Sequence, residues 1–212
     1  QDNFDLIIIE KKNEVYITVD CDPSVQREIS EFFTFYVPGY KFMPAFRNRM
    51  WDGKIRLFSQ KTKEIYFGLY PYIKAFAEER GYNIVSGKDV EIDNKVDKET
   101  VIKFSNSLGQ KFEARDYQID AIYYSLRRNR ALLVSPTASG KSFIIYSLIR
   151  YYTHLIKDES NNRILLIVPT TSLVEQMYTD FESYGWNVKR YCHRLYSGYS
   201  NQTDKKVLIS TW

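Results

Sequence analysis

Apolar and polar residues alternate along the first part of the chain in a way that predicts a small mixed domain. Every second residue of Glu14–Val19 is apolar, which predicts a half-buried strand, and Phe4–Ile9 predicts a partner strand before it. Asp22 followed by Pro23 is typical of a helix start, and apolar residues recur behind this pair at helical spacing. The pattern further predicts a second strand pair and a second helix at Lys54–Phe58, Glu64–Gly68 and Leu69–Arg80.

The second part of the chain has a different pattern of apolar residues, in which short apolar runs alternate with longer stretches of helical spacing. Helices are expected at Asp116–Arg128, Ser142–Leu155 and Ser172–Tyr184, and strands at Ala131–Val134, Arg163–Val168, Asn187–Cys192 and Val207–Thr211. Strands that are too apolar to face water on either side indicate a parallel sheet covered on both faces. We therefore expect an α/β domain preceded by a small α+β domain.

A polar stretch that is nearly free of aromatic residues separates the two parts. It predicts a domain at residues 1–85, a linker at 86–111 and a second domain at 112–212. One short helix is expected inside the linker, at Lys98–Ser107.

Composition excludes several classes of protein. The 212 residues are 44% hydrophobic and 26% charged, which is ordinary for a globular protein and excludes a chain that is disordered throughout. The aliphatic runs are far shorter than the roughly 20 residues that a bilayer span needs, and the sequence starts without a secretory signal, so we expect no membrane partner and either an intracellular chain or a mature fragment. Two cysteines and two histidines argue against a disulfide scaffold or a zinc site.

The segment from Ser135 to Ser142 contains the residue types that bind nucleotide phosphates. Phosphates need convergent backbone N–H groups at a helix start, a cation for the β- and γ-phosphate oxygens, and a hydroxyl for Mg²⁺. Gly140 lets the backbone approach closely, Lys141 supplies the cation and Ser142 supplies the hydroxyl. We expect ATP or GTP binding here, and the alternative is an ordinary strand, turn and helix with a chance Gly-Lys-Ser.

The same segment, Ser135-Pro-Thr-Ala-Ser-Gly-Lys-Ser142, resembles motif I of superfamily 2 helicases. It departs from that motif at Ala138, where a glycine is usual, and at Ser142, where a threonine is usual. The resemblance implies a RecA-like P-loop lobe that binds ATP and Mg²⁺, with Ser142 as the metal ligand. The cofactor-binding residues that it implies are Pro136, Thr137, Ala138, Ser139, Gly140, Lys141 and Ser142.

Three further segments match that family in order and spacing. They imply that Gln118 reads adenine, because an amide both donates and accepts hydrogen bonds, and that DNA phosphates are contacted by Pro169, Thr170, Thr171 and Thr211. Simpler alternatives exist: Gln118 could be a surface residue of an amphipathic helix, and Ser172 with Glu175 could form a capping box. Four segments in the right order over residues 112–212 favour the helicase.

Residues 39–57 narrow the resemblance from the helicase superfamily to one family within it. Their sequence, Gly-Tyr-Lys-Phe-Met-Pro-Ala-Phe-Arg-Asn-Arg-Met-Trp-Asp-Gly-Lys-Ile-Arg-Leu, resembles the N-terminal domain of the UvsW family of bacteriophage recombination and repair helicases. The resemblance implies an ATP-driven motor that remodels branched DNA, including fork regression and branch migration, and that unwinds RNA–DNA hybrids. A phage-encoded protein of this kind would act in the cytoplasm of a bacterial host cell.

A motor of this class also needs an acidic motif that holds Mg²⁺ and a second RecA-like lobe that supplies arginine fingers. Neither is found in the 212 residues, since Asp158-Glu159 lies in a polar loop and does not follow a strand. We therefore expect a fragment that binds ATP–Mg²⁺ and DNA without turnover. Two alternatives stay open: a translocase subunit of a restriction system, and a nucleic-acid-binding module with a vestigial phosphate loop.

Positive charge is concentrated in residues 41–63, where seven Lys and Arg residues are opposed by Asp52 alone. On a strand at Lys54–Phe58 the cations would lie on one face and the apolar side chains on the other, so that one face packs on helices while the other meets phosphates. We expect Trp51 in the core, with stacking of Trp51 or Phe46 on an unpaired base as the alternative. The DNA-binding residues expected here are Arg47, Arg49, Lys54 and Arg56.

Overall fold

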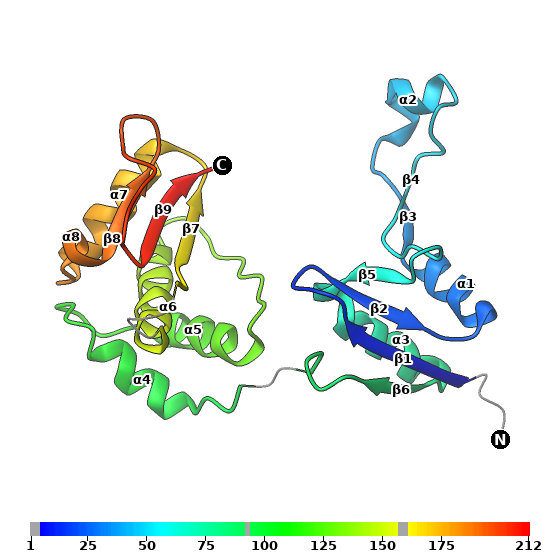
Figure 1. Ribbon diagram of the computed structural model, residues 1–212, viewed down its shortest axis with the longest axis horizontal. Coiled ribbons are helices and arrows are strands. Elements are labelled where there is room, and N and C mark those ends of the chain that lie inside the picture. Colours follow the sequence, from blue (N-terminus) through cyan, green and yellow to red (C-terminus); the bar gives the residue numbers. More distant parts are fainter. Residues whose placement is uncertain (1–4, 92–93, 157–160) are drawn as a thin grey trace. The chain divides into compact units, whose positions relative to one another are not determined.

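The computed structural model describes residues 5–91, 94–156 and 161–212 and divides the chain into two compact units, residues 1–92 and 93–212 (Figure 1). Much of the segment expected as a linker belongs to the second unit. Helix α4 (Lys98–Asn106) packs on α5 (Asp116–Arg128) through Val101, which is 2% exposed, and its Lys98 forms an ion pair with Asp120. The expected helix is therefore present, but it is not part of a solvated linker.

The first unit is built on a four-stranded sheet in the order β5-β2-β1-β6. Strand β1 runs antiparallel to β2 and parallel to β6, and the strands are β1 (Leu6–Lys11), β2 (Tyr16–Asp20), β5 (Glu64–Tyr66) and β6 (Asn83–Ser86). Two helices, α1 (Pro23–Phe32) and α3 (Tyr70–Arg80), cover one face of this sheet (Figure 1). The alternation in β1 and β2 buries Ile7, Ile9, Ile17 and Val19 completely against these helices.

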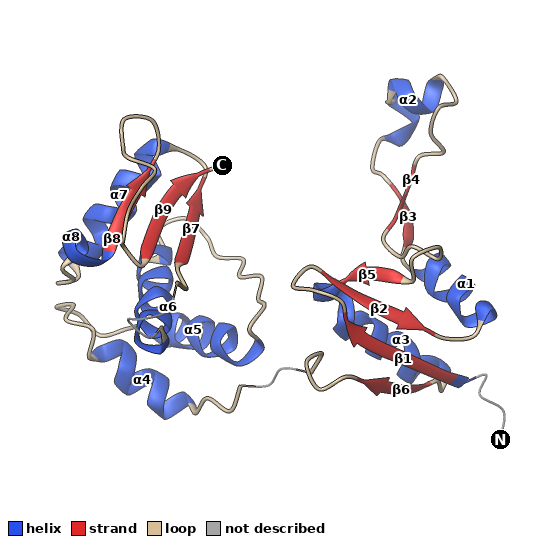
Figure 2. Ribbon diagram, in the orientation of Figure 1, coloured by secondary structure: helices blue, strands red, loops and turns tan. Residues whose placement is uncertain are grey.

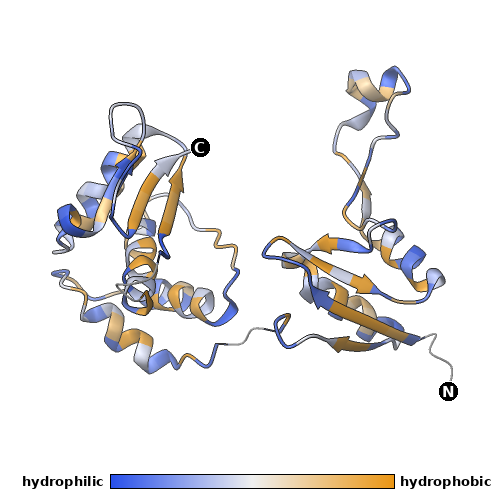
Figure 3. Ribbon diagram, viewed as in Figure 1, coloured by the Kyte–Doolittle hydropathy of each residue, from blue (hydrophilic) through white to orange (hydrophobic). Residues whose placement is uncertain are grey.

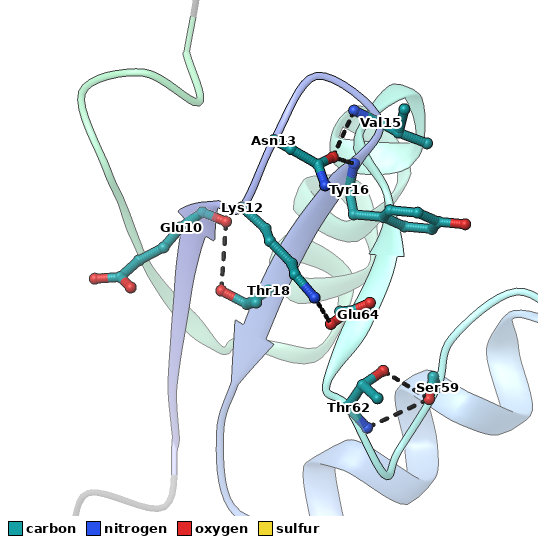
Figure 4. Close-up of polar contacts among 9 residues, drawn as sticks. All are labelled: Glu10, Lys12, Asn13, Val15, Tyr16, Thr18, Ser59, Thr62 and Glu64. Carbon is teal, nitrogen blue, oxygen red and sulfur yellow. Dashed lines mark hydrogen bonds and ion pairs between the residues drawn. The ribbon is translucent and has the colours of Figure 1, made fainter.

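The turn between β1 and β2 fixes the register of the sheet (Figure 4). The Asn13 side-chain oxygen accepts hydrogen bonds from the backbone N–H groups of Val15 and Tyr16, both at 2.8 Å, and Lys12 forms an ion pair with Glu64 of β5. Strand β1 begins two residues later than expected, and Phe4 lies outside the described residues. The expected helix start at Asp22 is confirmed, because its carboxylate accepts from the Ser24 N–H at 2.8 Å.

Residues 34–57, called here the arm, leave the body of the first unit (Figure 1). The arm consists of β3 (Thr34–Tyr36) paired with β4 (Lys54–Arg56), and between these strands lie a short 3₁₀ turn, η2 (Tyr40–Phe42), and α2 (Pro44–Arg47). The expected pairing of the segments at 54–58 and 64–68 is wrong, because β4 pairs with β3 while β5 pairs with β2. Of the apolar face expected to pack on helices, Leu57 packs against the core of the first unit, whereas Ile55 is 41% exposed.

The second unit contains a parallel sheet in the order β7-β9-β8, as expected for the α/β domain. Its strands are β7 (Ile164–Val168), β8 (Cys192–Leu195) and β9 (Val207–Thr211), and its remaining helices are α6 (Lys141–Leu155), α7 (Thr171–Ser183) and α8 (Val188–Tyr191). Val207 and Ile209 of β9 are fully buried with Val174 and Phe181 of α7. Figure 3 shows the apolar character of β7 and of the first part of β9.

Three expectations for the second unit are wrong. Residues 131–134 form no strand and lie in the loop between α5 and α6 (Figure 2), with Leu132 and Val134 86% and 92% exposed. The strand expected at 187–192 is instead helix α8, since the Asn187 side chain caps it by accepting from the Arg190 N–H at 3.2 Å. Leu165 and Ile167 are 56% and 51% exposed, so the sheet is not covered on both faces by described residues.

Candidate functional site

The phosphate loop spans Ser135–Gly140 and leads directly into α6, where Gly140 is the N-cap. Gly140 has a φ of 75°, in the left-handed region that favours glycine. A Cβ atom at this position would lie 2.4 Å from the side-chain nitrogen of Gln118. Glycine is therefore required here both by the backbone conformation and by the close approach of α5.

Gln118 lies under this loop and is only 5% exposed, so the surface alternative for it is wrong. Its Oε1 accepts from the backbone N–H of Arg115 at 3.0 Å, and its Nε2 donates to the carbonyls of Ser139 at 3.3 Å and Gly140 at 3.4 Å. The neighbouring Tyr117 hydroxyl donates to the same Ser139 carbonyl at 2.8 Å. The start of α5 thus positions the end of the phosphate loop.

Lys141 and Ser142 begin α6, and both bind neighbours in the structure. The exposed Lys141 ammonium donates to the carbonyls of Ser135 at 2.9 Å and Pro136 at 2.8 Å. The Ser142 hydroxyl lies 2.9 Å from the hydroxyl of Tyr184, the residue that ends α7. The Lys141 ammonium and the Ser142 hydroxyl therefore belong to consecutive residues at the N-terminus of α6, where a helix stabilises an anion.

The exposed part of the loop consists of Pro136, Thr137 and Ala138. Ala138 has a φ of 63°, a conformation that costs a non-glycine residue free energy. The departure from the helicase motif at this position therefore does not change the backbone, which stays in the region that glycine would adopt.

Two observations of the structure show that these residues fit a nucleoside triphosphate with Mg²⁺. The left-handed backbone of Gly140 turns the chain directly into the first turn of α6, whose N-terminal N–H groups can bind an anion. The donor set is also right, since an ammonium and a hydroxyl at a helix start suit phosphate oxygens and a hard cation. Among the described residues, no group of three His, Cys, Asp or Glu side chains could hold a metal, so a metal here would depend on the nucleotide.

A second set of expected residues meets at one edge of the parallel sheet. Val168 and Thr211 are register partners at the carboxyl ends of β7 and β9, and Pro169, Thr170 and Thr171 follow directly after β7. The Thr170 side chain caps α7 by accepting from the Leu173 N–H at 3.3 Å. The structure thus brings together all four residues expected to contact DNA in this unit.

The expected capping box of Ser172 and Glu175 is wrong, because Thr170 is the cap. Glu175 instead accepts from the Tyr196 hydroxyl and from the Arg194 guanidinium, each at 2.5 Å. The hydrogen bond from Tyr196, followed by that from Arg194, lowers the pKa of the Glu175 carboxyl. Glu175 therefore links α7 to the strand and loop around β8.

The four cations expected to bind DNA in the first unit all lie on the arm, but they are not equivalent. Arg56 forms an ion pair with Asp52, and the hydrogen bond from Arg56 lowers the pKa of that carboxyl. Lys54 lies over the ring of Tyr36, 5.0 Å from its centroid. Arg47 and Arg49 are exposed and form no ion pair with any other residue that the structure describes.

Trp51 is not in the core, so that expectation is wrong. Its side chain is half-buried within the arm, where its indole N–H donates to the Lys54 carbonyl at 2.9 Å. The core of the first unit is formed by the sheet, α1 and α3 and leaves the arm outside it.

Sequence reasoning missed two tyrosines, one that contacts the phosphate loop and one that contacts the first turn of α6. Tyr117 could have been found, because it adjoins Gln118 on the first turn of α5. Tyr184 gave no signal, since it is 42 residues from Ser142 and only the packing of α7 on α6 brings the two hydroxyls together. No described helix is long and apolar enough to cross a bilayer.

Comparison with known proteins defines first a class and then a family. Residues 111–212 match the model for the type III restriction enzyme res subunit, and residues 7–87 match the model for the N-terminal region of the DNA helicase UvsW. The chain is 34% identical over 207 residues to the ATP-dependent DNA helicase UvsW of enterobacteria phage T4, which covers 93% of this chain and 40% of that protein. The fold and the site thus define the class of protein: a helicase-type nucleotide-binding unit that follows a separate N-terminal unit in the sequence.

Two solved structures of T4 UvsW agree with this class. One matches with a TM-score of 0.83 and 30% identity, covering 97% of this chain and 74% of the other. The second matches with a TM-score of 0.83 and 31% identity, covering 97% of this chain and 42% of the other. The chain belongs to the UvsW family of DNA helicases.

Proposed function

We propose that this chain is the ATP- and DNA-binding part of a helicase that uses ATP to remodel branched DNA in recombination, repair and fork regression. The observation that carries the proposal is the phosphate loop, in which Gly140 has a φ of 75° and the Gln118 amide lies against the loop carbonyls. Membership of the UvsW family supports DNA as the substrate. Unwinding of RNA–DNA hybrids and action in the cytoplasm of a bacterial host are part of the same proposal.

On this proposal each residue of the site has a defined task. Lys141 exchanges its bonds to the carbonyls of Ser135 and Pro136 for the β- and γ-phosphate oxygens, and Ser142 provides an oxygen ligand for Mg²⁺. Gln118 exchanges its bonds to the Arg115 N–H and to the Ser139 and Gly140 carbonyls for the adenine edge, while Tyr117 keeps its hydrogen bond to the Ser139 carbonyl. ATP with Mg²⁺ supplies the free energy for movement along DNA through cleavage of the terminal phosphate.

A titration with a fluorescent ATP analogue tests the nucleotide site. Wild-type chain is expected to bind the analogue weakly in the presence of Mg²⁺, and Lys141→Ala is expected to abolish this binding. Binding by neither protein would favour the alternative of a nucleic-acid-binding module with a vestigial loop. Turnover is expected to be negligible, so DNA-stimulated ATP hydrolysis that Lys141→Ala abolishes would contradict that part of the proposal.

A restriction-type translocase is the second candidate, because residues 111–212 match the res-subunit model. The two candidates share the phosphate loop and differ in the first unit, whose residues 7–87 match the UvsW N-terminal model. Gel-shift titrations with a four-way junction and with duplex of equal length separate them. The helicase proposal expects tighter binding of the junction, whereas equal affinities would favour the translocase.

A further inference from the structure

A hollow of about 590 Å³ lies on the arm, and none of the phosphate-loop residues lines it. Its lining comes from one short stretch of chain: Phe46, Arg47, Arg49, Met50, Trp51 and Asp52. The stretch combines two aromatic rings and a thioether with two cations and one carboxylate. The hollow therefore presents flat apolar surface and charge together.

The walls of the hollow are held in place by bonds within the arm. The Trp51 indole donates to the Lys54 carbonyl at 2.9 Å, and the Phe46 ring packs edge-on against Tyr40 with centroids 4.8 Å apart. Gly53 lies beneath Tyr40 at a φ of 80°, and a Cβ there would come within 2.3 Å of the Tyr40 ring. The sequence thus places a glycine where it lets the tip of the arm close on itself, and the hollow is preformed.

Three further features of the lining bear on the ligand that it binds. Arg49 has a φ of 57°, and a strained conformation of this kind at a non-glycine residue is concentrated at ligand sites. Met50 is 75% exposed, and its thioether presents a polarizable surface beside the rings. Asp52 Oδ1 accepts from the Lys54 N–H at 3.1 Å and from Arg56 at 3.4 Å, and Oδ2 accepts from Arg56, which leaves lone-pair capacity on Oδ2 for a further donor.

We propose that this hollow binds one unpaired nucleobase of a DNA strand at a branch point. Trp51 and Phe46 provide stacking surface for the base, Asp52 accepts from N–H groups on its exposed pairing edge, and Arg47 and Arg49 bind the flanking phosphates. A base inside a duplex is already stacked and paired, so it cannot enter, and the hollow selects branched over continuous DNA. The inference rests on the proposed function, because it assumes that the chain binds branched DNA.

The test compares two DNA molecules that contain 2-aminopurine, one with this base unpaired at a fork and one with it paired in a duplex. The wild-type 212-residue chain is expected to bind the fork about tenfold more tightly and to quench the unpaired base, since stacking on an aromatic ring is worth about 5- to 150-fold per base. Trp51→Leu and Phe46→Leu are each expected to remove most of the preference for the fork and leave duplex affinity unchanged. Phe42→Leu is the matched control, because Phe42 is an arm residue that is 83% exposed and does not line the hollow.

Each outcome decides the inference. Equal losses of fork and duplex affinity in Trp51→Leu would show that Trp51 only holds the arm together, and an unchanged fork preference in both variants would place the base elsewhere. Met50 lines the hollow and is 75% exposed, so Met50→Ala should not affect folding. If the two ring variants fail to fold, an unchanged preference for the fork in Met50→Ala would count against binding of the base in the hollow. Wild-type chain that binds neither DNA would overturn the proposed function itself, and this inference with it.

Discussion

Replacing Gly140 with alanine tests whether the phosphate loop is built as described. Left-handed backbone costs a non-glycine residue about 1–2 kcal/mol. The new methyl carbon would lie 2.4 Å from the Gln118 amide nitrogen, so this buried amide must withdraw from two loop carbonyls, at about 0.5–1.5 kcal/mol each. The free energy of unfolding of the second unit should therefore fall by about 2–5 kcal/mol.

Urea unfolding followed by the fluorescence of the buried Trp186 measures this loss, in a background where Trp51 and Trp212 are changed to Phe. Gly198→Ala is the matched control in the same unit, because Gly198 has a φ of 97° and nothing within 4 Å of its added Cβ. It should show the backbone strain alone, about 1–2 kcal/mol. Adding Gln118→Ala to Gly140→Ala removes the clash, so the two losses should not add. Equal losses in Gly140→Ala and Gly198→Ala would refute the contact with Gln118.

The remaining predictions address the motor, the arm and a buried thiol. In the whole protein, Lys141→Ala is expected to stop unwinding while DNA affinity stays within about twofold, because its partners are phosphates of the nucleotide; an equal loss of DNA affinity in a folded variant would contradict this. Changing Arg47, Arg49 and Lys54 to Ala should lower the salt slope of DNA affinity by about 1 for each phosphate that is no longer neutralised, measured by titration at several salt concentrations, and an unchanged slope would remove the arm from the DNA surface. Burial raises the pKa of the Cys192 thiol to about 12, so alkylation at pH 8 should be about a thousandfold slower than in urea, and mass spectrometry showing equal rates would refute its burial.

Local features of the fold could be predicted from the sequence because their causes lie within a few residues of one another. The bounds of α5 at Asp116–Arg128 follow from helical periodicity, and the start of α1 follows from the capping carboxylate of Asp22. The same holds for the phosphate loop, since Gly140, Lys141 and Ser142 are consecutive and precede a helix. The sequence by itself therefore determined the class of fold and the residues that could bind phosphates.

Only the tertiary structure decided which segments meet. Strand β4 pairs with β3, which the sequence did not predict, because the partner of a strand depends on contacts far apart in the chain and not on alternation alone. Residues 131–134 have the apolar pattern of a strand but form none, since a strand requires a neighbour that accepts and donates its backbone hydrogen bonds. The burial of Gln118 beneath Gly140 and the contact of Ser142 with Tyr184 likewise come from the packing of helices, which brings together side chains whose spacing in the sequence gives no sign of their contact.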